Sequence, residues 1–75
     1  MRRVDKIDYD GLRAVLNWSP TGVVVYPTPE GWQVRKDTAV LYGEESGRPR
    51  VWRRVDRAIE QLKQIGAREV TVQLA

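Results

Sequence analysis

Arginine is crowded into one short stretch of the chain, residues 47–57, which reads GRPRVWRRVDR. The guanidinium group presents a planar fork of hydrogen-bond donors that matches phosphates and carboxylates, whereas lysine acts mainly as a point charge. Ten of the 13 cationic residues are arginines, so the composition also favours recognition of anions. The candidate anion-binding residues are Arg48, Arg50, Arg53, Arg54 and Arg57.

The position of these arginines is unfavourable for stability, because the same stretch is predicted to begin a helix. Pro49 suits the first helical position, Gly66 suits the residue after a helix, and apolar residues between them recur with a 3.6-residue period. The partial positive charge of a helix N-terminus disfavours nearby cations. The predicted apolar face comprises Val51, Trp52, Val55, Ala58, Ile59, Leu62 and Ile65, and the solvent-facing ridge comprises Arg50, Arg53, Arg54 and Arg57.

Two hypotheses account for this arginine ridge. In the first, the ridge binds an anion, either the phosphates of nucleic acid or an acidic protein surface. In the second, it is a solvated polar face in which Glu44 and Glu45 fold back and pair with Arg50 or Arg54. Such a surface pair contributes less than about 1 kcal/mol. A secondary basic group lies in residues 1–7, which we expect to form a flexible arm, and its cations are Arg2, Arg3 and Lys6.

Catalytic and metal-binding residue types are scarce. The chain has no histidine and no cysteine, which removes the usual base, the thiolate nucleophile and the preferred zinc ligands. Glu44 and Glu45 are the only adjacent carboxylates, and in a loop their side chains point apart, unlike a paired acid and base. We therefore expect a non-enzymatic protein with no catalytic residue, no metal and no cofactor.

The tryptophans and Tyr26 are predicted to pack in the hydrophobic core rather than to contact a ligand. Trp52 lies on the flank of the predicted helix stripe, and Trp18 closes the first helix, where it could pack against the sheet. Trp32 and Tyr26 flank the loop of a predicted hairpin, where stacking on a nucleobase is the alternative.

The elements around the arginine stretch are predicted to form a small α+β domain. Helices should pack on one face of a mostly antiparallel sheet. The last strand follows a helical crossover, so it should lie parallel to the first or third strand of the preceding meander. In chain order, we predict a short helix from Asp8 or Asp10 to Trp18, meander strands over 23–26, 32–35 and 38–42, a long amphipathic helix over 49–65 and a final strand over 68–74.

The length of 75 residues is that of one small domain, predicted to span 1–75. The formal net charge is +3, which permits an anionic partner without requiring one. The sequence contains neither the apolar run of a signal peptide nor one long enough to span a membrane. We expect a bacterial-type, cytoplasmic protein that has no membrane partner.

The C-terminal half carries a resemblance to a known group of proteins. The run GRPRVWRRVDRAIEQLKQIGAREVTVQL, residues 47–74, resembles small partition-associated (ParC-like) proteins of plasmids and integrative elements. The resemblance implies an accessory protein of a mobile element and supplies no catalytic residue. The matching positions are Gly47, Pro49, Arg50, Trp52, Arg53, Val55, Asp56, Leu62, Ile65 and Gly66.

These observations predict a binding module rather than an enzyme. The first hypothesis is a mobile-element accessory protein whose arginine ridge contacts nucleic-acid phosphates. The alternative is a protein-interaction module, whose ridge meets an acidic partner or which forms a homodimer through an open sheet edge.

Overall fold

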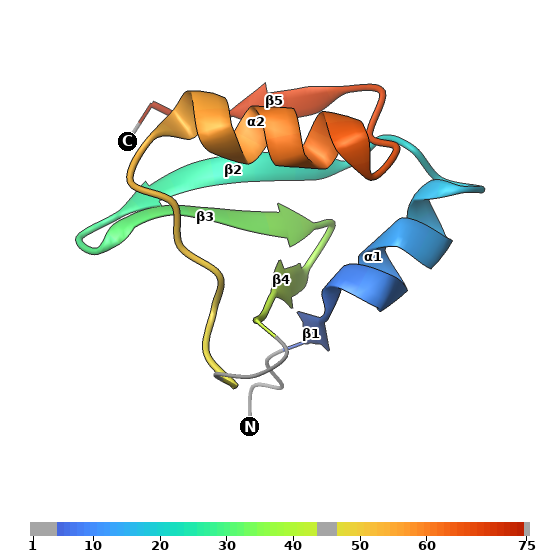
Figure 1. Ribbon diagram of the computed structural model, residues 1–75, viewed down its shortest axis with the longest axis horizontal. Helices are drawn as coiled ribbons and strands as arrows, with labels where there is room; N and C mark the ends of the chain where they lie inside the picture. The colour runs from blue at the N-terminus through green and yellow to red at the C-terminus, as the bar shows by residue number, and fades with distance from the viewer. Residues whose placement is uncertain (1–4, 44–46, 75) are drawn as a thin grey trace.

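The computed structural model of the protein describes residues 5–43 and 47–74, and it has the predicted α+β class (Figure 1). Arg2, Arg3, Glu44 and Glu45 lie outside the described residues. No helix in the described ranges is long and apolar enough to cross a membrane. In chain order the elements are β1 (Lys6–Ile7), α1 (Tyr9–Leu16), β2 (Val23–Thr28), β3 (Gly31–Lys36), β4 (Ala39–Leu41), α2 (Val55–Gln64) and β5 (Val70–Val72).

The five strands form one mixed sheet in the order β1-β4-β3-β2-β5. The central β2-β3-β4 meander is antiparallel, as predicted, and β5 lies parallel to β2, one of its two predicted neighbours. β1 adds a second parallel pair beside β4. The sheet therefore has equal numbers of parallel and antiparallel pairs, which corrects the prediction of a mostly antiparallel sheet.

The strand β1 was not predicted. Lys6 and Ile7 pair with Val40 and Leu41 of β4, so they belong to the sheet and not to a flexible arm over residues 1–7. The half-buried Ile7 packs against the core, and this contact anchors the short strand. A two-residue strand is too short to show the alternation of apolar and polar residues that identifies strands in a sequence.

The first helix follows the predicted capping pattern. The Asp8 carboxylate accepts a hydrogen bond of 2.7 Å from the Gly11 amide, which satisfies one of the unpaired donors of the helix N-terminus. Leu12 and Leu16 are buried. The helix ends at Leu16, and Trp18 is 76% exposed, so the prediction that Trp18 packs against the sheet is wrong.

The second helix begins later than predicted, at Val55 instead of Pro49. Residues 47–54, named here the arginine strap, precede it as an extended segment that runs up to α2 (Figure 1, yellow to orange). Pro49 forms a bridge with Tyr42, and Trp52 forms one with Trp32. Arg50 and Trp52 form backbone hydrogen bonds with Leu41 and Trp32 of the sheet, so the apolar period before residue 55 does not form a helix.

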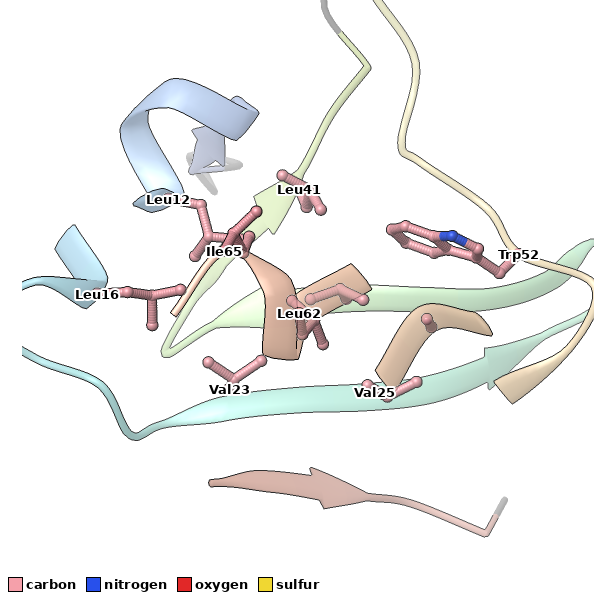
Figure 2. Close-up of a cluster of buried hydrophobic side chains, with 10 residues drawn as sticks. Leu12, Leu16, Val23, Val25, Leu41, Trp52, Leu62 and Ile65 are labelled. Atoms are coloured by element: carbon pink, nitrogen blue, oxygen red, sulfur yellow. The ribbon is translucent and has the colours of Figure 1, made fainter. Parts of the chain in front are cut away.

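The core lies between α2 and the sheet, and α1 contributes to it. Figure 2 shows Leu62 of α2 next to Val23 and Val25 of β2, whereas Ile65 lies toward Leu12 of α1 and Trp52 of the strap lies at the other end of the cluster. Leu62 is fully buried, as predicted, whereas Val51, Val55 and Ile59 are only half-buried. The buried apolar residues are Leu12, Leu16, Val23, Val25, Val34, Leu41, Trp52, Ala58, Leu62 and Ile65.

Candidate anion-binding site

All five candidate arginines are exposed, but they do not form a ridge on one helix. Only Arg57 lies inside α2, at its third residue, and Arg54 is the N-cap, with the extended dihedral angles φ −121° and ψ 131°. The other three lie on the arginine strap: Arg48, Arg50 and Arg53. The site is thus an extended segment that continues into the first turn of a helix, and the predicted helical ridge is wrong in geometry.

The backbone of the arginine strap is held by the sheet. Trp32 and Trp52 exchange two hydrogen bonds of 2.7 and 2.9 Å, and the Arg50 amide donates to the Leu41 carbonyl at 2.9 Å. The Gly43 amide donates to the Arg48 carbonyl, also at 2.9 Å. Because the strap is tied at both ends, its exposed arginines project from a fixed backbone.

Arg50 is oriented by two aromatic side chains. Its Nε donates a hydrogen bond of 3.2 Å to the Tyr9 hydroxyl, and its guanidinium carbon lies 5.0 Å from the centroid of the Trp52 ring. The second contact has cation–π geometry. Arg50 nevertheless remains exposed, so these contacts limit its rotamers without removing it from an incoming anion.

Arg54 is engaged by a neighbouring carboxylate. Its Nε and one terminal nitrogen donate to the two Asp56 oxygens at 3.1 Å each. Both side chains are well exposed, so the pair contributes less than about 1 kcal/mol to stability. Within residues 5–43 and 47–74, Arg53 and Arg57 have no ion-pair partner, and Glu60 does not pair with Arg57. Pairing with Glu44 or Glu45 concerns residues that the structure does not describe.

A hollow of about 320 Å³ is lined by Trp52 of the strap and by one side of α2 as far as its last residue, Gln64. Trp52 forms one wall, and the rest of the lining is polar side chains of α2. Guanidinium and amide groups of this kind can bind phosphate oxygens or the edge of a base. The lining residues are Trp52, Arg57, Glu60, Gln61 and Gln64.

The start of α2 should gain stability when its arginines are replaced. Arg54 is an N-cap that makes no side-chain capping bond, and Arg57 is a cation in the first turn. The double variant Arg54→Ser/Arg57→Glu creates a capping box, in which each new side chain satisfies a backbone amide of the first turn. After loss of the exposed Arg54–Asp56 pair, we expect the free energy of unfolding to rise by about 1 kcal/mol in urea denaturation.

The control for this variant is Arg13→Ser/Arg68→Glu, which makes the same change in net charge on exposed residues outside the strap and α2. It should leave the free energy of unfolding within about 0.5 kcal/mol of the wild-type value. A loss of more than about 1 kcal/mol in Arg54→Ser/Arg57→Glu would identify the arginines as structural ion-pair partners.

A second group of polar and aromatic residues lies on the sheet; the sequence analysis named two of its members, Lys6 and Tyr26, but did not predict that they belong to one surface. Lys6 Nζ lies 4.8 Å from the centroid of the Tyr42 ring, and the Arg35 guanidinium carbon lies 6.0 Å from that of Tyr26. The Tyr26 hydroxyl donates to Gln33 Oε1 at 3.1 Å. The alternation of strands 23–26 and 32–35 was the available signal, because it places Gln33 and Arg35 together on the face opposite the core.

Burial raises the pKa of the Tyr26 hydroxyl above its ordinary value of 10.0, and Arg35 opposes this with a smaller effect. A raised pKa in the folded state stabilises the protein fully below pH 10, and this contribution is lost as pH rises through the folded pKa. We expect the tyrosinate absorbance that Tyr26→Phe removes to have its titration midpoint above pH 10. A midpoint at or below pH 10 would contradict the assignment.

Comparisons with known proteins assign no chemistry to these groups. No protein-family model matches the chain, and no curated protein or solved structure matches it significantly. Among the described residues, no group of three or more acidic, histidine or cysteine side chains is arranged to hold a metal ion. The candidate function therefore rests on the arginines and the aromatic groups themselves.

Proposed function

We propose that this chain is a non-enzymatic binding module whose arginine strap, together with Arg57, contacts the phosphates of nucleic acid. The observation that carries the proposal is the exposure of all five arginines. Four lie on the strap, whose backbone is hydrogen-bonded to the sheet, and Arg57 lies in the first turn of α2, a helix whose N-cap makes no side-chain capping bond. Cations at that position oppose the helix dipole. Residues that reduce stability and remain exposed are typical of a binding role.

The surroundings of the arginines favour phosphates over an acidic protein surface. Protein interfaces depend on apolar or aromatic anchors at their centre. The aromatic residue of the strap, Trp52, is only 8% exposed and belongs to the core, so it offers no such anchor. Phosphate contacts need only the guanidinium groups.

We further propose that the protein is an accessory factor of a mobile element, as the resemblance of residues 47–74 to ParC-like proteins implies. We also propose that both helices share the covered face of the sheet. Support for this packing comes from Leu12 and Leu16 of α1, which join the same core cluster as Leu62 of α2. The opposite face would then remain accessible to a ligand.

The test is the salt dependence of binding. Fluorescence anisotropy with labelled mixed-sequence DNA, both duplex and single-stranded, should show affinity falling with log salt at a slope of about −3 if three or four phosphates are contacted. Arg54→Ser/Arg57→Glu should weaken binding at low salt and reduce the slope by about 1–2.

The Arg13→Ser/Arg68→Glu variant serves as the charge-matched control and should retain most of the affinity. Unchanged binding by Arg54→Ser/Arg57→Glu would show that the strap is not the phosphate site. Absence of salt-dependent binding to either DNA form would refute the proposed function.

A further inference from the structure

The face of the sheet opposite the core has a different character from the covered face. Residues paired in the ladders share a face, which places Val24 beside Arg35 and Thr71, and Tyr26 beside Gln33. Every buried strand residue in the described part of the chain lies on the core face. The opposite face, named here the tyrosine face, comprises Lys6, Val24, Tyr26, Thr28, Gln33, Arg35, Val40, Thr71 and, directly after β4, Tyr42.

Two aromatic rings dominate the tyrosine face, and each has a cation beside it. Lys6 accompanies the Tyr42 ring at 4.8 Å, and Arg35 accompanies the Tyr26 ring at 6.0 Å. Both tyrosines are half-buried, so they keep accessible surface while packing on the sheet. Tyr26 lies on β2 and Tyr42 directly follows β4, the two strands that flank β3, so the hydrogen-bonded sheet fixes the backbone under both rings.

The charge of the tyrosine face suits an anionic ligand. Its strand residues include two cations, Lys6 and Arg35, and no Asp or Glu occupies a paired strand position on this face in the described residues. The Tyr26 hydroxyl donates to Gln33 and carries no charge at neutral pH. A ligand for this face therefore combines negative charge with flat unsaturated groups.

The tyrosine face is also continuous with the arginine strap. Tyr42 forms a bridge with Pro49, and the next residue, Gly43, donates to the Arg48 carbonyl. A ligand that crosses the sheet from Tyr26 to Tyr42 reaches the strap backbone at this bridge. Arg50 contacts Tyr9 and Trp52 on the covered side, so a single chain that also binds the strap arginines must pass from one side of the sheet to the other.

We propose that the tyrosine face binds single-stranded nucleic acid, with bases stacked on Tyr26 and Tyr42 and phosphates at Arg35 and Lys6. Successive bases of a single strand stack on aromatic side chains in a positively charged groove, and stacking tolerates any sequence. Paired bases in a duplex do not expose their faces to a sheet. The proposal extends the proposed function, because it assigns the form of nucleic acid that the strap contacts.

The experiment compares base-containing and abasic ligands. The probe is a labelled oligothymidine of about 12 nucleotides, a length that covers one small binding surface. Wild-type protein should bind it at least about fivefold more tightly than an abasic oligomer of equal length and charge, and more tightly than a duplex of that length. Oligouridine serves as the ribose counterpart, and preferential binding of either single strand supports the proposal.

The variants are Tyr26→Leu and Tyr42→Leu, which keep an apolar side chain and remove the aromatic ring. Each should weaken oligothymidine binding at least about fivefold and leave the weaker binding of the abasic oligomer unchanged. Trp18→Leu is the matched control, because Trp18 is an exposed aromatic residue outside the sheet, and it should bind like the wild type. Thermal melts establish that each variant is folded at the temperature of the titration.

The outcomes separate this proposal from the proposed function. Equal binding of oligothymidine and abasic oligomer would overturn base stacking on the tyrosine face, and so would unchanged binding by both tyrosine variants. Either result would do so even if Arg54→Ser/Arg57→Glu still weakens binding. Loss with the tyrosine variants and none with the arginine variant supports the tyrosine face and overturns the strap as a phosphate site. A stable dimer that Tyr26→Leu dissociates would overturn the proposal, because the face would then be covered by a second copy.

Discussion

Leu62→Ala is expected to lower the free energy of unfolding by about 2–5 kcal/mol. Leu62 is fully buried on α2, within the cluster that joins this helix to Val23 and Val25. Removing its side chain leaves a cavity between helix and sheet, and the loss includes both burial and packing contacts. A domain of this size has little stability in reserve, so the variant should be partly unfolded at 37 °C. Urea denaturation followed by far-UV circular dichroism measures the change.

The matched control is Leu74→Ala, which removes the same atoms from a leucine that is 88% exposed. Its free energy of unfolding should change by less than about 0.5 kcal/mol. Near-wild-type stability of Leu62→Ala would contradict the packing of α2 on the sheet described above.

Gly31→Ala is the second large effect, with an expected loss of about 2–5 kcal/mol. Gly31 has φ +141°, which L side chains rarely adopt, and an added Cβ would lie 2.7 Å from both the Trp52 carbonyl oxygen and Val51 Cγ1. The first atom belongs to the backbone of the arginine strap, so relief requires the strap to move. We expect weaker nucleic-acid binding together with lower stability, measured by urea denaturation and anisotropy.

Gly47→Ala separates the cost of the positive φ from the cost of the steric clash with the strap. Gly47 also has a positive φ, +64°, but no atom from the described part of the chain lies within 4 Å of an added Cβ. Its substitution should cost only the backbone strain, about 1–2 kcal/mol. Equal losses for the two variants would show that contact with the strap does not restrict Gly31.

Much of the fold could be predicted because local signals agreed with the tertiary structure. The β-branched run at 23–25 forms the buried strand, and Asp8 caps the first helix. Gly66, with φ +111°, follows α2 as predicted, and the Ala67 amide donates to the Leu62 carbonyl across the helix end. Each of these features depends on residues close together in the chain.

The start of α2 could not be predicted for a physical reason. Pro49, Val51 and Trp52 continue the helical period of the residues that follow, so the pattern alone favours a longer helix. The structure instead places Trp52 in the core from an extended backbone that bonds to Trp32. That pairing joins residues 20 positions apart, and no local signal reports it.

The candidate site was predicted in composition but not in geometry. The exposure of the five arginines follows from their charge, whereas their arrangement depends on where α2 begins. The tyrosine face required knowledge of the sheet order, because Tyr26 on β2 and Tyr42 directly after β4 come from segments that β3 separates in the sheet. Only the fold shows that their rings share one surface.

The two edge strands of the sheet have a consequence for the order of folding. β1 and β5 come from opposite ends of the chain, and each joins the sheet through a parallel pairing with a strand distant in sequence. The central hairpins form through short turns, so their pairing costs little chain entropy. The pairing of β1 with β4 and of β5 with β2 closes a long loop and costs more. We expect the meander to form first and both ends to dock last. Amide hydrogens of the edge strands should therefore exchange through partial opening, before the central β3 loses its protection.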